Sequence, residues 1–190
     1  MKGLLFAVLG IAVFAGLLFV PAYADTSSSA VGEVQVIVNP NVAVSIPENP
    51  PEVNHQTGDV SVTLTFVVDA NQQEVCLFAE ASDLWKGDDP TNPDGVAPIP
   101  VDTDVPVVIQ PLHANPIHSG TNKAAFIGAG TPIGEFPTLL TDTICFESSQ
   151  NNRFSQPVDV TITWNQDDAE KPTGEYSGMV RLTALVVDAV

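Results

Sequence analysis

Basic side chains are scarce in this sequence. The 190 residues contain six Lys and Arg against 23 Asp and Glu, which gives a formal net charge of −17 at pH 7. A surface of this sign repels the phosphates of nucleic acids and the head groups of anionic lipids. We therefore exclude nucleic acid as a partner, and we expect no attachment to a membrane once the N-terminal leader described below is removed.

The short motifs that mark common enzyme classes are also missing. The sequence contains neither the G-x-S-x-G elbow of hydrolases nor the H-E-x-x-H pair of zinc proteases. Its three histidines do not form the close set of ligands that a catalytic zinc needs, because His55 is far from His113 and His118. Serine and aspartate are too frequent for either to single out a catalytic triad. We predict that the protein is not an enzyme and has no catalytic residues.

Charge is absent from one long stretch near the N-terminus. Lys2 precedes the apolar run Leu4–Val20, and Pro21-Ala22-Tyr23-Ala24 follows it. This order of a basic start, an apolar core and small residues predicts a signal peptide over residues 1–24 and a secreted protein, extracellular or at the cell surface. Two alternatives stay open: a retained membrane anchor, since the run approaches a spanning length, and a pilin-type signal cut at Lys2-Gly3. Nothing later in the sequence resembles a membrane span.

Cysteine occurs only twice. Cys76 and Cys145 lie in the similar contexts VCLF and ICFE, both short apolar segments typical of strands. An even number of cysteines in an exported chain indicates a disulfide. We predict one structural bridge between these two residues.

Sustained helical periodicity is missing after Ala24, and alternation of apolar with polar residues takes its place. The alternation predicts strands with one buried face. The predicted strands are 34–38, 42–46, 60–68, 74–81, 104–110, 143–147, 158–164 and 175–187. Two segments rich in Pro and Gly, 83–103 and 111–137, are predicted to be loops.

This pattern predicts an all-β fold. A flexible leader over residues 25–31 precedes one domain over residues 32–190, with seven to nine strands around one core. We predict an immunoglobulin-like antiparallel β-sandwich with Greek-key connections. A closed barrel is the alternative architecture.

The loop 83–103 concentrates aspartate and one tryptophan. Asp88, Asp89 and Asp94 are candidate calcium ligands, although the D-x-[DN]-x-[DN]-G pattern fails because Pro90 stands at its first position when counted back from Gly95. Trp85 is the candidate exposed aromatic for contact with a sugar ring. Trp164 ends an alternating strand and is predicted to be core. We predict that the protein has no cofactor, and calcium is the one alternative.

The closing segment GEYSGMVRLTALVV, residues 174–187, carries the spacing G-x-Y-x-G-x-V-x-L-T. It resembles the last strand of immunoglobulin-like sandwiches in secreted surface proteins of bacteria and archaea, including pilin-like and spore-coat-like families. The resemblance implies assembly by strand donation, in which the terminal segment of one subunit fills a gap in its neighbour.

The N-terminal segment is suited to that role. A polar leader precedes Val34, Val36 and Val38, which alternate as in a donor strand that could add to a sheet edge. The alternative is an ordinary first strand of the chain's own domain. We predict a structural subunit of an extracellular filament, pilus-like fibre or surface matrix, which polymerises with copies of itself. The alternative function is a secreted carbohydrate-binding or adhesive module, with a glycan as partner and calcium as an optional cofactor.

Overall fold

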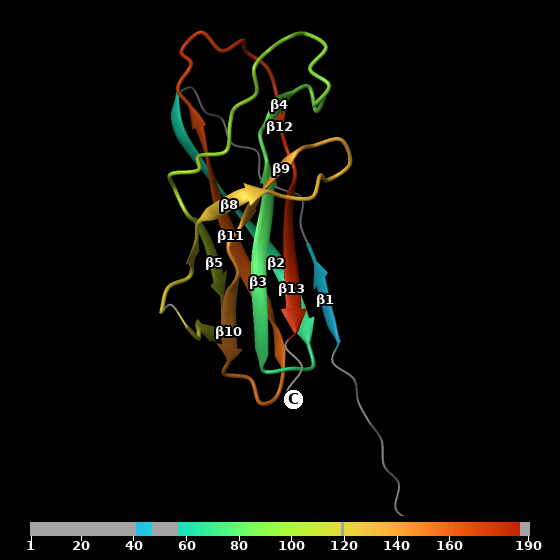
Figure 1. The fold of residues 1–190 in the computed structure, drawn as a ribbon, viewed down its shortest axis with the longest axis vertical. Helices are drawn as coiled ribbons and strands as arrows, with labels where there is room; N and C mark the ends of the chain where they lie inside the picture. Colours follow the sequence, from blue (N-terminus) through green and yellow to red (C-terminus); the bar gives the residue numbers. More distant parts are fainter. Residues whose placement is uncertain (1–40, 47–56, 119, 187–190) are drawn as a thin grey trace, which may run out of the picture. The chain divides into compact units, whose positions relative to one another are not determined.

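The computed structural model of the chain describes residues 41–46, 57–118 and 120–186, all of which belong to one compact unit, Val38–Val190. The described residues form strands and turns and contain no helix (Figure 1). Accordingly, no helix among them has the length and apolar character needed to cross a membrane. The predicted signal peptide, the leader and the donor residues Val34, Val36 and Val38 lie outside the described residues.

Thirteen strands lie in this part of the chain. In chain order they are β1 (Val42–Ser45), β2 (Gly58–Ala70), β3 (Glu74–Ser82), β4 (Trp85–Lys86), β5 (Val107–Pro111), β6 (Ala114–Pro116), β7 (Lys123–Ala124), β8 (Phe126–Ala129), β9 (Thr138–Thr141), β10 (Ile144–Ser148), β11 (Phe154–Gln166), β12 (Tyr176–Ser177) and β13 (Val180–Val186). Nine of them have four or more residues, and the other four have two or three.

Sheet A has the strand order β1-β2-β11-β5-β7, with every pair antiparallel. Its centre is the pair of β2 and β11, which match over their full length from Gly58↔Gln166 to Ala70↔Phe154. Both strands alternate valine, leucine, isoleucine or phenylalanine with serine, threonine and aspartate, so one face of the pair is apolar.

Sheet B is centred on β3. On one side β3 pairs with β13, and on the other side it pairs first with β10 and then with β9; β6 and β8 complete the sheet. The register shifts by one residue between the pairs Ile144↔Leu77 and Leu140↔Glu80. At this shift the hydroxyl oxygen Oγ1 of Thr141 accepts a hydrogen bond from the backbone N–H of Ala79, 2.9 Å away. A buried side chain therefore replaces a missing ladder bond, as at a β-bulge.

The core lies between the two sheets. The turn after β2 leads directly into β3, and the turn after β10 leads into β11, so the chain passes from one sheet to the other at both points. Val68 and Val158 of sheet A and Leu77 and Phe146 of sheet B are fully buried in one apolar cluster. Trp164 is also buried, and its indole Nε1 donates to the carbonyl of Ser82 at 2.9 Å, which links β11 to β3. The prediction that Trp164 is core is confirmed.

Two antiparallel sheets around a shared core are compatible with the predicted β-sandwich and confirm the all-β class. Most predicted strands of the described residues are present within a few residues of their predicted ends. The predicted closing strand 175–187 is wrong as one element, because it is divided into β12, which pairs with β4, and β13, which pairs with β3. The two predicted loops differ. Segment 83–103 contains β4 and places Ile99 and Val101 in the core, and segment 111–137 contains β6, β7 and β8. These strands are too short for alternation to reveal them, and their pairing depends on distant partners.

Candidate functional site

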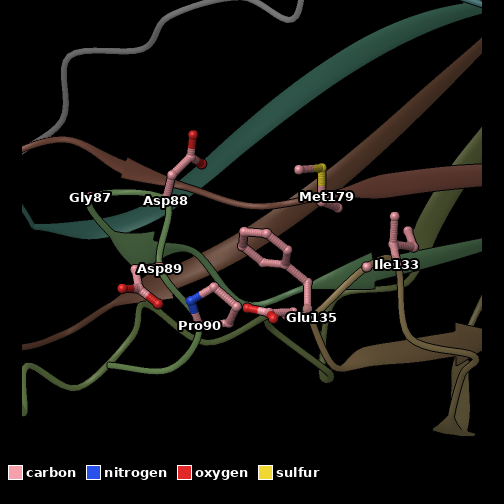
Figure 2. A pocket seen from close by; sticks show the side chains of 9 residues that line it. Gly87, Asp88, Asp89, Pro90, Ile133, Glu135 and Met179 are labelled. Atoms are coloured by element: carbon pink, nitrogen blue, oxygen red, sulfur yellow. The ribbon is translucent and has the colours of Figure 1, made fainter. Parts of the chain in front are cut away.

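A cleft of about 590 Å³ opens between three segments (Figure 2). The residues directly after β4 form one wall, and the turn between β8 and β9 forms a second. Met179, just before β13, completes the lining. The lining residues are Gly87, Asp88, Asp89, Pro90, Ile133, Gly134, Glu135, Phe136 and Met179. The lining therefore combines three carboxylates with the apolar side chains of Pro90, Ile133, Phe136 and Met179.

Hydrogen bonds within each wall fix the shape of the cleft. Asp88 adopts a left-handed backbone conformation, with φ of 63°, and its carboxylate accepts a hydrogen bond from the hydroxyl of Ser177 on β12. Asp89 caps its own turn, because its carboxylate accepts from the backbone N–H of Thr91 at 2.9 Å and from the hydroxyl of the same residue at 2.6 Å. In the opposite wall, Ile133 and Phe136 exchange two backbone hydrogen bonds.

The predicted calcium ligands do not converge. Figure 2 shows the carboxylate of Asp88 pointing away from those of Asp89 and Glu135. Asp94 is not among the lining residues. Within the described part of the chain, the group of three metal-ligating side chains that come within 4.8 Å of one another is Glu74, Cys76 and Cys145, and its two sulfurs are bonded to each other. Calcium binding by Asp88, Asp89 and Asp94 stays a prediction.

Trp85 lies beside the cleft without lining it. Its strand β4 pairs with β12, where Trp85 stands opposite Ser177, and the residue is half-buried. Its indole Nε1 is buried and has no hydrogen-bond partner among the residues that the structure describes. The predicted contact between Trp85 and a glycan stays a prediction.

The end of the molecule that carries the cleft is strongly acidic. Ten acidic residues lie in segments 83–104 and 167–175. Lys171 joins these segments, since its ammonium donates to the carbonyls of Ala97 and Pro98 at 3.0 and 3.2 Å. Burial, and to a lesser extent the charge of Asp168, raises the pKa of Tyr176 in the same region. Sequence reasoning identified the acidity but not this clamp.

The predicted disulfide is present. Cys76 on β3 and Cys145 on β10 stand directly opposite each other and form the bond. Both strands belong to sheet B, so the bridge joins neighbouring strands within one sheet. In antibody domains the conserved disulfide instead joins the two sheets through the core. Here Val75 and Leu77 face the core, and the disulfide therefore lies on the outer face of sheet B.

A buried ion pair on the same outer face was not anticipated from the sequence. The carboxylate of Glu80, a residue that is 4% exposed, accepts from Nε of Arg181 at 2.5 Å and from the backbone N–H of Thr131 at 2.7 Å. Arg181 also donates to the carbonyl of Thr131 at 2.8 Å. The bond from Arg181 lowers the pKa of Glu80 below 4.5, and the bond from Thr131 adds to this effect against the opposing effect of burial. The network ties the turn that walls the cleft to β3 and β13.

Close packing at Gly130 supports this network. A Cβ atom at this position would lie 2.6 Å from Oγ1 of Thr138 and 2.8 Å from Oε1 of Glu80. The absence of a side chain lets the backbone approach the buried carboxylate. The pairing of β3 with β13 brings Glu80 and Arg181 together, and this pairing cannot be read from the sequence. The one sign of a buried charge in the sequence is Glu80 itself, which stands within the apolar segment CLFAEAS.

The outer face of sheet A is a ladder of polar pairs across β2 and β11. Ser61 is hydrogen-bonded to Thr163 and Thr63 to Thr161, each at 2.8 Å. Further along, Thr65 donates to Asp159 at 2.6 Å, and Ser155 donates to Asp69. Each of these side chains is opposite its partner in the strand register. These four pairs thus satisfy one another, whereas the buried Oδ1 of Asn165 at the end of the same face has no hydrogen-bond partner among the described residues.

The outer face of sheet B consists of four rows that cross its strands. The rows, read from the register, are Glu74–Glu147, then Leu185–Cys76–Cys145, then Thr183–Phe78, then Arg181–Glu80–Leu140. A shallow groove of about 610 Å³ runs over the last two rows. Leu185 is 49% exposed, and Ile127 on the neighbouring strand β8 is 63% exposed.

The chemistry available to these surfaces is recognition. The cleft offers carboxylates beside apolar side chains, and carboxylates suit a ligand that carries hydrogen-bond donors or positive charge. The outer face of sheet B offers an apolar area with charge at its two ends.

Comparison of this chain with protein-family models, with curated proteins and with solved structures found no match.

Proposed function

We propose that the protein is a structural subunit of an extracellular filament, pilus-like fibre or surface matrix. In this proposal residues 1–24 direct export, the domain is an immunoglobulin-like Greek-key sandwich, and the segment with Val34, Val36 and Val38 is donated to a neighbouring subunit. The protein is not an enzyme in this reading.

The observation that supports the proposal is the position of β13 at the edge of sheet B. β13 pairs with β3 over all seven of its residues, and no other strand among the described residues pairs with it. β1 lies beside β13 without pairing to it (Figure 1). An edge of this kind presents a row of unpaired backbone donors and acceptors to which another strand can add.

The chemistry of β13 suits an added strand. Leu182 and Ala184 face the core, while Arg181, Thr183 and Leu185 face outward. A donated strand would continue this division, with its own apolar residues at the edge of the core. Val34, Val36 and Val38 supply three such residues at intervals of two. In the sequence they stand shortly before β1.

The test is a proline in the donated segment. Val36→Pro removes a backbone N–H and disfavours strand pairing, while Ser28→Pro in the leader is the matched control. We expect electron micrographs of material sheared from cells to show fibres for the unchanged chain and for Ser28→Pro, but none for Val36→Pro. Circular dichroism checks that Val36→Pro still folds. Fibres of normal number from a folded Val36→Pro chain would disprove donation, and the absence of this chain from any fibre would disprove the structural role.

A second function, glycan binding or adhesion, is favoured by one observation. The acidic cleft carries Phe136 and Met179 beside the carboxylates of Asp89 and Glu135, and carboxylates can accept hydrogen bonds from sugar hydroxyls. Binding to immobilised glycans, with and without calcium, would test it. Loss of binding in Trp85→Ala would assign the contact to Trp85, and loss in Glu135→Gln would assign it to the cleft.

A further inference from the structure

The two outer faces of the molecule differ in how their side chains are satisfied. Most hydroxyls on the outer face of sheet A are hydrogen-bonded across β2 and β11, whereas the outer face of sheet B exposes Leu185 to solvent. We propose that the outer face of sheet B is an interface between two copies of this chain, which stack face to face with their strands antiparallel.

The apolar part of the interface lies in its two middle rows. These rows contain Leu185, the disulfide of Cys76 and Cys145, and Phe78. Leu140 on β9 stands in the next row, beside the row of Phe78. Leu185 is half exposed, whereas Ala184 beside it faces the core and is buried. A contiguous apolar patch of this kind marks an interaction surface more often than single scattered residues do.

The charges at the two ends of the face identify the occupant. Glu74 and Glu147 stand directly opposite each other at one end, an arrangement of like charges that is unfavourable in an isolated sheet. Arg181 stands at the other end. Antiparallel stacking of two copies brings the arginine of each to the level of the glutamate pair of the other. The face is thus complementary to itself, as a two-fold interface requires.

Arg181 has the capacity for this second contact. Two of the donors of its guanidinium are used by Glu80 and Thr131, out of the five that an arginine carries. Its side chain is 37% exposed, so the remaining donors can be reached from outside the sheet. The glutamate pair of a second copy would supply acceptors for them.

The rest of the described surface disfavours contact between copies. Sheet A presents Asp69 and Asp159 on its outer face, and the end with the cleft carries the ten acidic residues noted above. Since every copy bears a net charge of −17, approach through these surfaces is opposed by repulsion. On the outer face of sheet B, by contrast, Arg181 supplies a positive charge that a second copy can use.

This interface does not depend on strand donation. Stacking of two faces closes on itself as a dimer, whereas donation through β13 extends a chain. In a fibre the two contacts would serve different purposes, one along the filament and the other between adjacent filaments. Either contact can exist without the other.

The experiment is sedimentation of the exported full chain between about 1 and 100 µM, the range over which a dimer of micromolar dissociation constant changes mass. If fibres form, the same measurement is made in the Val36→Pro background, which removes the donated strand. We expect a dimer that dissociates on dilution. Leu185→Asp should raise the dissociation constant at least about a hundredfold, because it places a carboxylate in the apolar rows. Leu112→Asp is the matched control, since Leu112 is 63% exposed and lies outside this face.

A second variant tests the charges. Glu74→Gln with Glu147→Gln removes the negative end of the face, and we expect the dissociation constant to rise about tenfold. Thermal melting must show that each variant folds. A chain that is monomeric over the whole range would overturn the proposal, as would a dimer weakened equally by Leu185→Asp and Leu112→Asp. A dimer insensitive to the loss of Glu74 and Glu147 would overturn the antiparallel arrangement.

Discussion

The outer faces of the two sheets occupy equivalent places in the fold but differ in chemistry. On sheet A, four pairs of polar side chains are hydrogen-bonded across β2 and β11, and most of these side chains are at least partly exposed to water. On sheet B, a carboxylate that is 4% exposed, a disulfide and an exposed leucine share one face. A sheet with one solvated face normally shows the first pattern. The second pattern departs from it.

The comparison also separates two ways in which polar contacts act on stability. In an exposed pair such as Thr63 with Thr161, the hydrogen bond between the two side chains replaces hydrogen bonds that each would make to water. Each such pair therefore contributes little to the free energy of unfolding. The pair of Glu80 and Arg181 removes a carboxylate from water, and its loss leaves that charge without compensation. The faces should therefore respond very differently to mutation.

The largest effect is expected for Arg181→Ala. The change leaves Glu80 buried beside only the backbone of Thr131, and we expect the free energy of unfolding to fall by about 3–5 kcal/mol. Chemical denaturation measures it. Arg153→Ala is the matched control, because Arg153 lies exposed in a turn, and it should change stability by less than about 0.5 kcal/mol. Equal effects of the two variants would remove the distinction between the faces.

The next largest effect is expected for loss of the disulfide. Cys76→Ala with Cys145→Ala opens a loop with a sequence separation of 69, and we expect the free energy of unfolding to fall by about 2–4 kcal/mol. Denaturation of the unchanged chain with and without a thiol reductant should reproduce the difference. The double variant should not respond to the reductant. A bridge whose removal leaves the denaturation midpoint unchanged would show that strand pairing alone holds β3 to β10.

Much of the fold could be predicted because long strands repeat their pattern. β2 and β11 have thirteen residues each and alternate apolar with polar side chains over most of their length, and this period of two assigns their buried faces. β4, β7 and β12 have two residues each, so no periodicity exists to detect them. The burial of Ile99 and Val101 within an apparent loop has the same cause. Ile99 pairs with Leu84 and Val101 pairs with Trp164, and these pairings depend on the tertiary fold and not on the local sequence.

The site could be predicted only where one residue carries the signal. Two cysteines in a chain that is predicted to be exported indicate a bridge, which the structure contains. The ion pair depends instead on the register that places Arg181 opposite Glu80, residues far apart in the sequence. Likewise, the cleft joins Met179 to two loops that composition alone cannot align. Pairing between strands is the information that a single sequence lacks.

A smaller effect, confined to acid, is expected from the titration of Glu80. Hydrogen bonds from Arg181 and Thr131 lower the pKa of Glu80 below 4.5, so the folded state favours its ionised form. The resulting stabilisation is fully present above pH 4.5 and is lost as the pH falls through the lowered pKa. We expect the stability advantage of the unchanged chain over Glu80→Gln to be constant near neutral pH and to shrink in acid. Denaturation midpoints measured at a series of pH values would show this, and an advantage that grows in acid would contradict the sign.

The smallest effect is expected on the outer face of sheet A, at the pair of Thr63 and Thr161. Replacing either threonine alone by valine leaves one hydroxyl without its partner at an exposed site, where water can take its place, so each change should cost less than about 1 kcal/mol. Replacing both gives two β-branched side chains of similar shape across the strands, and valine is as suited to a strand as threonine. The double variant should therefore recover most of the loss, with a coupling energy below about 1 kcal/mol in a double-mutant cycle. A coupling of several kcal/mol would place this exposed pair in the same class as Glu80 and Arg181. The difference between the faces would then reflect the number of polar contacts on each, and burial would no longer explain it.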